Sequence, residues 1–270
     1  MEYFWSFFTI QAVLIAVVLS VHTYLGLHII RRNIIFTDLA LDQLAALGVI
    51  VGIGMGMEGG TTGSYVVSFA AVLVGAVLLA AVKPKRKEIP REAVIGIIYC
   101  LALVASFLTA EHISGGLGYV TQTLAGTILW VNWDLVWVTL VSYVLISVFH
   151  FIYRDKITGI TDGRVTKNVV FWDLLFFLTE GIITVLIVPI AGVLLAYAFL
   201  MIPAAIATLF TRGWTSGLLI GWGVGYIACF IGIMGSYFLR LPYGPCLVLS
   251  LGAFFLGALI LRLLMSKQTV

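Results

Sequence analysis

The chain has 270 residues, of which 62% are hydrophobic and only 10% charged, with a mean hydropathy of +1.15 and a net charge of +3 at pH 7. Because a soluble domain carries about 25% charged residues, this composition excludes a water-soluble enzyme, a disordered chain and a nucleic-acid-binding protein. It predicts an all-α polytopic membrane protein in which residues 1–270 form a single transmembrane domain in a lipid bilayer.

Apolar runs of membrane-spanning length follow one another along almost the whole chain. A helix of roughly 20 apolar residues crosses the bilayer core, so eight or nine crossings are expected. The first positive charge is Arg31, which indicates a retained first helix and not a signal peptide. The segment 112–130 is Gly-rich, too short to cross, and compatible with a re-entrant half-helix. The apolar runs are 5–29, 34–57, 65–82, 93–110, 134–153, 169–188, 190–211, 215–238 and 245–264, with a division at Pro189.

The basic residues are distributed asymmetrically over the expected loops. If the N-terminus lies outside, all of the 15 Lys and Arg residues except Arg240 fall on the cytoplasmic side. Cytoplasmic loops of membrane proteins carry such an excess of Lys and Arg. The sequence therefore predicts a multi-pass protein of the cytoplasmic membrane, with the N-terminus outside and the C-terminus inside.

Four acidic residues fall within apolar runs, and no basic residue is expected at their depth. An acid in hydrocarbon is costly, so it normally faces a partner, a water-filled path or an ion. Asp173 is only about two turns into its helix and is expected near the membrane interface. The other three, Asp38, Asp42 and Glu180, are expected deeper in the bilayer.

Asp38 and Asp42 are spaced to lie on one helix face, about 6 Å apart along the axis, with Gln43 adjacent. Two carboxylates on one face repel each other unless a cation or a proton lies between them. Carboxylate and amide oxygens suit divalent cations such as manganese, and carboxylates also bind zinc. The sequence therefore predicts a metal site formed by Asp38, Asp42, Gln43 and Glu180.

Structural alternatives remain for each of the three carboxyl groups. Asp38 is equally compatible with a first-turn residue stabilised by the helix dipole and by Arg31 or Arg32. Asp42 is compatible with a protonated acid bonded to a neighbouring helix. Glu180 is compatible with a neutral acid bonded to a backbone carbonyl.

The stretch 154–168 is the longest expected cytoplasmic segment and alternates charged with small residues. It is compatible with an ordinary solvated loop or with a short surface element that docks a soluble partner. The residues expected to form the docking element are Thr158, Gly159, Ile160, Thr161, Asp162 and Gly163.

Enzyme motifs are not recognisable in the sequence. The four histidines lack the spacing of a zinc hydrolase or a two-histidine haem site, and no phosphate-binding loop follows the glycines at 115–118. The glycine row Gly217, Gly221 and Gly225 indicates close helix packing. We therefore expect no enzymatic activity and no permanently bound cofactor.

Several stretches together resemble the permease family of ABC importers for divalent metals (zinc, manganese, iron). The most specific is GVLLAYAFLMIPAAIA at 192–207, and shorter matches are LAGTIL at 124–129, AVIGI at 93–97 and LPYGP at 241–245. Arg31 and Arg32, followed by Phe36, Thr37 and Asp38, match the start of the second helix. The resemblance covers nearly the whole chain, in the right order.

The resemblance implies a prokaryotic importer in which a divalent metal is the transported substrate. It implies a homodimer of permeases or a pair with a paralogue, cytosolic ABC ATPase subunits docked on the 154–168 stretch, and an extracytoplasmic metal-binding protein. ATP hydrolysis would then take place on a partner chain.

The resemblance also bears on the candidate metal residues. In the family, the second helix carries an Asp and, four residues later, a His. Asp38 matches the Asp, whereas Asp42 stands at the His position, and Gln43 takes that place if the chains are aligned on Gly48. The loss of an imidazole argues mildly against a site optimised for zinc.

A second functional class is also considered. A self-contained secondary transporter or channel for cations would use Asp42 and Glu180 as an ion or proton relay. Such transporters usually contain inverted repeats, and none is evident in the sequence.

Overall fold

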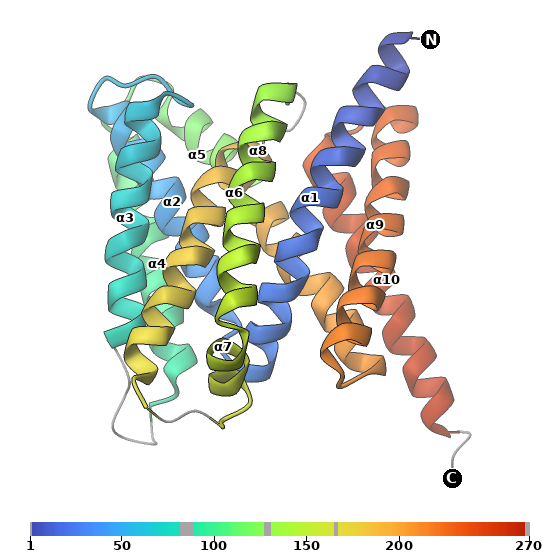
Figure 1. Ribbon diagram of the computed structural model, residues 1–270. Coiled ribbons are helices and arrows are strands. Elements are labelled where there is room, and N and C mark those ends of the chain that lie inside the picture. Colours follow the sequence, from blue (N-terminus) through green and yellow to red (C-terminus); the bar gives the residue numbers. More distant parts are fainter. Residues whose placement is uncertain (1, 82–88, 127–130, 165–166, 268–270) are drawn as a thin grey trace. The chain divides into compact units, whose positions relative to one another are not determined.

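The structure is a computed structural model that describes residues 2–81, 89–126, 131–164 and 167–267. All regular structure in these residues is helical, which confirms the all-α expectation (Figure 1). The helices are α1 (Glu2–Arg32), α2 (Phe36–Gly54), α3 (Thr62–Ala81), α4 (Arg91–Ala110), α5 (Gly116–Ala125), α6 (Trp133–Ile152), α7 (Arg154–Thr161), α8 (Val169–Phe210), α9 (Trp214–Leu239) and α10 (Tyr243–Lys267).

Eight helices in the described part of the chain are long and apolar enough to cross a membrane. The longest, α8, has 42 residues and a non-helical backbone at Gly192. At 1.5 Å per residue it would measure about 63 Å, twice the thickness of a bilayer core. Each part on either side of Gly192 is long enough for one crossing. The division therefore falls three residues after the expected one, and Pro189 lies inside the helix.

The segment expected to be a half-helix contains α5, which has 10 residues and measures about 15 Å. This length is half of a bilayer core, so α5 is too short to cross it. Residues 127–130, which belong to the same expected segment, lie outside the described residues.

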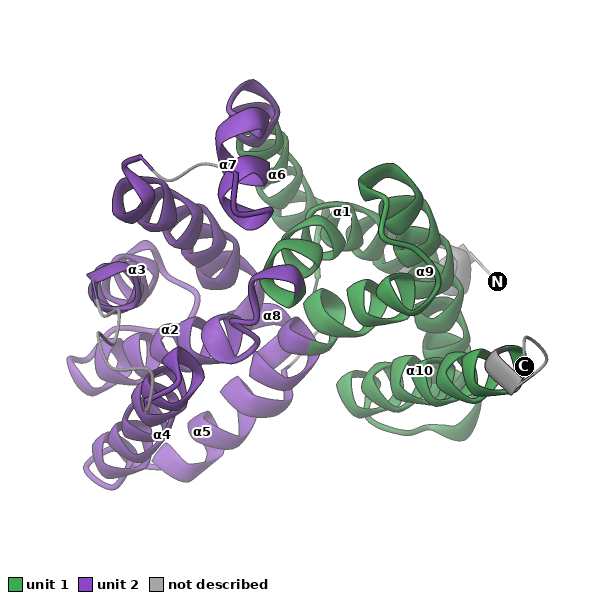
Figure 2. Cartoon of the chain, turned by 90° about the horizontal axis from the view of Figure 1, so that it is seen from below, with its two compact units in different colours: residues 1–30, 128–147, 198–270 green, residues 31–127, 148–197 purple. Residues whose placement is uncertain are grey.

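The chain forms two compact units, each built from separate segments (Figure 2). Unit 1 comprises residues 1–30, 128–147 and 198–270, and unit 2 comprises residues 31–127 and 148–197. Because α1, α6 and α8 each contribute residues to both units, the units do not correspond to halves of the sequence.

Small residues bring the helices of unit 1 into close contact. A Cβ atom at Gly26 of α1 would lie 2.1 Å from the Leu200 carbonyl oxygen. A Cβ at Gly221 of α9 would lie 2.5 Å from the Thr23 methyl group, and one at Gly225 would lie 3.0 Å from the Pro203 ring. The expectation that the glycine row of α9 serves helix packing is therefore confirmed.

Helix α2 forms the centre of unit 2, where it packs against α3 and α4 and contacts α5. A Cβ at Gly48 would lie 2.4 Å from Cα of Ser68, whose hydroxyl donates a 3.0 Å hydrogen bond to the Ala45 carbonyl. Ile50 of α2 is fully buried in a cluster with Ala110 of α4 and Val120 of α5. These contacts remove most of the surface of α2 from any surrounding lipid.

Two glycines with positive φ meet within unit 2. Gly126 ends α5 with φ 78°, and Gly192 interrupts α8 with φ 76° and ψ 160°. A Cβ at Gly192 would lie 2.3 Å from the Gly126 nitrogen, and a Cβ at Gly126 would lie 2.0 Å from the Ala191 carbonyl oxygen. Only glycine fits at either position, because the backbones themselves are in contact and Gly192 occupies a region of φ and ψ reserved for glycine.

We predict that Gly192→Ala destabilises the protein by at least about 1–3 kcal/mol, the cost of forcing a residue with a Cβ into this backbone conformation. The matched control is Gly96→Ala in α4, where a Cβ would meet nothing within 4 Å. The control should be neutral or up to about 1 kcal/mol more stable, since alanine favours helix. Thermal unfolding of the purified protein in detergent measures both, and equal melting temperatures would contradict the prediction.

Candidate functional site

The carboxyl groups of Asp38 and Asp42 lie inside unit 2. Asp38 occupies the first turn of α2 and is 3% exposed, and Asp42 is fully buried one turn later. Neither carboxylate oxygen of Asp42 has a hydrogen-bond partner, and the same holds for Oδ2 of Asp38. Both residues are buried because α3 and α4 cover the helix that carries them.

Glu180 of α8 joins these two residues. It is 1% exposed, and neither of its carboxylate oxygens has a hydrogen-bond partner. Asp38 and Glu180 both lie close enough to Asp42 to repel a negative charge on it, and the buried Thr184 lies beside Asp42. The structure therefore brings together three of the four predicted metal residues from two helices that are far apart in the sequence.

We call these three acids (Asp38, Asp42 and Glu180) the carboxyl cluster. Their carboxyl groups are buried without enough hydrogen-bond donors or positive charge to compensate for the loss of solvent. A buried polar group without a partner costs free energy, and a buried charge costs more. Within the described residues, no group of three or more His, Cys, Asp or Glu side chains is arranged so that it could already hold a metal ion. The cluster can attract a cation, but it does not form a closed coordination site.

The Gln43 side chain contacts a different helix from the one that Asp42 faces. Its Nε2 donates a 3.2 Å hydrogen bond to the Ser106 hydroxyl of α4, which in turn donates a 2.9 Å bond to the Ala102 carbonyl. Consecutive residues on a helix are rotated by about 100°, so Gln43 faces α4 while Asp42 faces α8. The Gln43 Oε1 atom is buried and has no hydrogen-bond partner.

The expectation that no basic residue lies at the depth of Asp173 is wrong. Asp173 is 1% exposed and forms an ion pair with Arg32, and its other oxygen lies 3.8 Å from Arg91. The sequence did not reveal this group, because Arg32 ends α1 and Arg91 begins α4. Arginines at helix ends are expected at the membrane boundary and not beside a buried acid.

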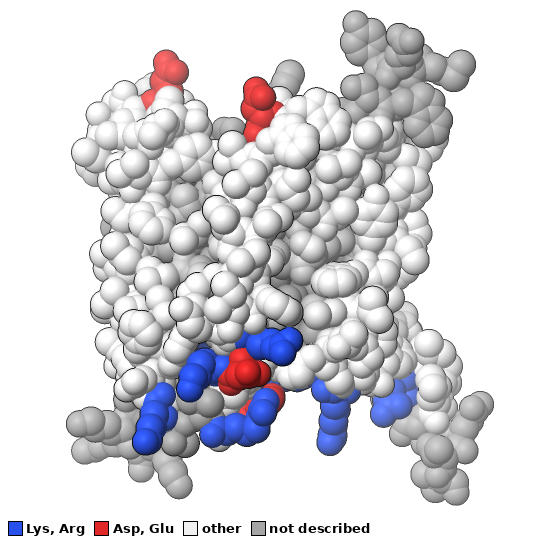
Figure 3. Space-filling view, in the orientation of Figure 1, with Lys and Arg blue, Asp and Glu red and all other residues white. Residues whose placement is uncertain are grey.

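The first half of the predicted docking stretch 154–168 is helical and is not an open loop, and residues 165–166 of this stretch lie outside the described residues. Residues Arg154–Thr161 form α7, in which Ile157 and Gly159 are buried. Asp162, which follows the helix, lies 2.7 Å from Arg164 and 4.0 Å from Arg31. Figure 3 shows Lys and Arg side chains gathered around this end of unit 2.

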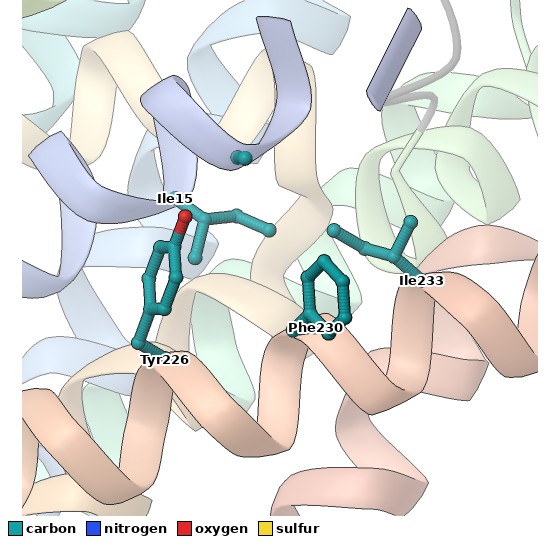
Figure 4. Close-up of a pocket in the computed structure, with 5 residues that line it drawn as sticks. Ile15, Tyr226, Phe230 and Ile233 are labelled. Atoms are coloured by element: carbon teal, nitrogen blue, oxygen red, sulfur yellow. The ribbon is translucent and has the colours of Figure 1, made fainter. Parts of the chain in front are cut away.

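Unit 1 contains an apolar depression that offers no alternative site for a charged substrate. It is lined by Ala12 and Ile15 of α1 and by Tyr226, Phe230 and Ile233 of α9 (Figure 4). None of these side chains is a charged group or a favourable metal ligand. The carboxyl cluster of unit 2 is therefore the better candidate for a functional site.

The chain is similar to proteins that are named as metal transport proteins. The manganese transport system membrane protein MntC of Listeria monocytogenes is 24% identical over 232 residues, which are 83% of this chain and 80% of that protein. A probable metal transport system membrane protein of Chlamydia trachomatis is 24% identical over 205 residues, which are 74% of this chain and 67% of that protein.

The fold also matches a solved structure, PsaBC from Streptococcus pneumoniae in complex with Fab. The TM-score is 0.74 at 20% identity, and the match covers 92% of this chain and 89% of that one. A model of the ABC 3 transport family matches residues 6–262. Because this match covers almost the whole sequence, the chain belongs to the ABC 3 transport family and is a membrane-spanning transport subunit of an ABC transporter, not an enzyme.

Proposed function

We propose that this chain is the permease subunit of an importer for a divalent metal ion, with manganese as the favoured substrate. The observation that carries the proposal is the carboxyl cluster, in which five of the six carboxylate oxygens are buried without a hydrogen-bond partner. Carboxylate oxygens are hard ligands that suit Mn²⁺, and the cluster contains no imidazole or thiolate. Relatives of the chain are named manganese transport proteins. Membership of an ABC family argues against a self-contained secondary transporter.

In this proposal the cluster binds the ion during passage and does not retain it. A permeation site must bind strongly enough to admit the ion and weakly enough to release it. Asp42 is the central ligand because Asp38 and Glu180 both act electrostatically on it and both favour a cation there. Gln43, whose Oε1 lacks a partner, supplies a further oxygen ligand if its side chain turns away from Ser106.

We predict that Asp42→Asn cuts ATP-driven Mn²⁺ uptake by about tenfold or more, the effect expected when one charged ligand of a hard cation is lost. Folding should not suffer, because the substitution removes a buried acid and leaves the size of the side chain unchanged. Uptake of radioactive manganese into cells that express the complete transporter measures the first effect, and the amount of assembled complex measures the second.

Two further variants accompany this measurement. Asp38→Asn and Glu180→Gln remove the other charges of the cluster and should each reduce uptake, while Asp134→Asn changes an exposed acid outside the cluster and serves as the control. If Asp42→Asn transports manganese like the wild type, the role of Asp42 in the ion path is refuted.

We further propose that α7 and the residues after it dock the cytosolic ATPase subunit. The support is the exposed polar surface of the short helix and its place among basic helix ends. The proposed contact residues are Thr158, Gly159, Ile160, Thr161, Asp162 and Gly163, of which Gly159 is buried and acts through the shape of the helix.

We predict that replacing residues 158–163 by a Gly-Ser linker of equal length releases the ATPase from the complex. Such a linker melts α7, since glycine disfavours helix by about 1 kcal/mol per residue. Copurification of the ATPase with the tagged permease should fall below detection, and metal-stimulated ATP hydrolysis should be lost. Normal copurification and transport would show that the ATPase docks elsewhere.

The remaining partners and the orientation follow the same proposal. We infer an extracytoplasmic metal-binding protein, a second permease in the same complex, and a cytoplasmic membrane in a prokaryote as the location. The support for the orientation is that only Arg240 among the basic residues falls on the proposed outer side.

We predict that a cysteine at position 2 reacts from outside the cell with a membrane-impermeant maleimide. Labelling at this position only after the cells are opened would reverse the orientation. A cysteine in α7, for example at position 155, should show the opposite accessibility and provides the matched control.

A further inference from the structure

A buried ion pair joins two arginines at the basic end of unit 2. The Arg32 side chain is 8% exposed and contacts Asp173, which is 1% exposed. Arg91 lies 3.8 Å from the same carboxylate and donates a 2.8 Å hydrogen bond to the Leu79 carbonyl, while its Nε has no partner. The buried Asp173 carboxylate therefore faces two guanidinium groups, and Glu92 also acts electrostatically on Arg91.

Two aromatic rings hold these guanidinium groups in place. The Arg32 guanidinium lies 5.0 Å from the centre of the Phe176 ring and 5.7 Å from that of Phe177. Arg91 lies 5.5 Å from the Phe177 ring. Stacking on a ring face favours a cation and restricts its movement. The positive charges are therefore fixed, unlike those of solvated surface arginines.

This group ties together the ends of several helices of unit 2. Arg32 ends α1, Arg91 begins α4 and bonds to the end of α3, and Asp173 lies near the start of α8. The adjacent Glu92 accepts hydrogen bonds from the first backbone N–H groups at the start of α2. Three helix N-termini, those of α2, α4 and α8, thus meet here and add the positive ends of their dipoles.

The fixed charges lie directly in line with the carboxyl cluster along α8. Asp173, Phe176 and Phe177, and Glu180 follow at spacings of three or four residues, so they share one helix face. Asp173 and Glu180 are about 10 Å apart along the axis. Arg32 acts electrostatically on Glu180 across this distance. A cation at the carboxyl cluster therefore faces two rings and then two guanidinium groups on this side.

We propose that Arg32 and Arg91, held by Asp173, Phe176 and Phe177, form an electrostatic gate that keeps the transported cation at the carboxyl cluster. The ion can leave toward the basic end of unit 2 only when the helix ends tied by this gate move apart and carry the guanidinium groups away. The gate rests on the proposed function for the identity of the ion and for the direction of its passage. Arg32 acts on the ion through its electric field and does not bind it, so it is a positioning residue.

A structural role alone makes a different prediction. A buried ion pair can often be replaced by apolar residues of similar size without loss of stability, whereas removing one partner leaves an uncompensated charge. The double variant Arg32→Met/Asp173→Leu therefore keeps the packing and removes the pair. If the pair only stabilises the fold, cation permeability should not change.

The test measures passive Mn²⁺ entry, without ATP, into liposomes that contain the complete transporter and a dye quenched by Mn²⁺. Arg91→Met removes one net positive charge and should raise entry about tenfold, because a fixed charge about 10 Å from the ion acts through a low dielectric. The double variant removes one charge of each sign and should therefore raise entry less. Arg32→Lys keeps the positive charge and should stay near the wild type, and Arg240→Met is the control for loss of an exposed arginine.

Chloride entry is measured in the same liposomes, because a disordered protein would leak anions as well as cations. Unchanged Mn²⁺ entry in Arg91→Met would overturn the gate, and so would a parallel rise in chloride entry. If Arg91→Met does not assemble, Arg91→Gln decides, and wild-type entry in that variant overturns the proposal. If the wild type shows no ATP-driven Mn²⁺ uptake while the variants differ in passive entry, the proposed substrate is wrong and the gate stands.

Discussion

Three acids without a counter-charge, enclosed by protein, form the constraint on which unit 2 depends. Asp38, Asp42 and Glu180 reach neither solvent nor, in the described structure, an arginine, and most of their oxygens lack hydrogen-bond partners. A fold stabilised only by burial would place apolar side chains at these positions, since an unpaired buried acid costs free energy. The packing of α2 against α3, α4 and α5 must therefore contribute enough free energy to outweigh this cost.

Close helix packing in this protein depends more on glycines than on large side chains. Gly48 lets α3 approach α2 at backbone distance, and Gly126 and Gly192 let α5 touch the interruption in α8. In a bilayer the apolar surface of a helix gains little by leaving lipid, so helices associate through close van der Waals contact and hydrogen bonds. The glycines therefore provide the rigidity that holds the carboxyl cluster in place.

The fourth buried acid of unit 2 differs from the other three because it is paired with positive charge. Asp173 has two arginines and two aromatic rings around it, while Glu180, two turns further along α8, has no hydrogen-bond partner for its carboxylate. The difference divides the helix into an end where the acid is paired with arginines and a middle where the acid is unpaired. Such a division suits a transport subunit, because a mobile cation is attracted to the unpaired acid in the middle.

The sequence by itself determined the fold class, the spans and the membership of a transport family. These depend on composition, on the length of apolar runs and on local motifs such as IPAA at 202–205, all of which are properties of neighbouring residues. It also determined that Asp42 and Glu180 are buried, because an acid in the middle of a long apolar run has no nearby water.

Only the tertiary structure decided which partners these residues have. Helical spacing places Asp42 and Gln43 on one helix, but only the packing shows that Asp42 faces Glu180 and Gln43 faces Ser106. The pairing of Asp173 with Arg32 joins residues 141 positions apart, and the break in α8 falls at Gly192 because the backbone of Gly126 occupies the space that a side chain would need. Contacts of this kind depend on how helices approach one another, and no local pattern in a single sequence encodes that approach.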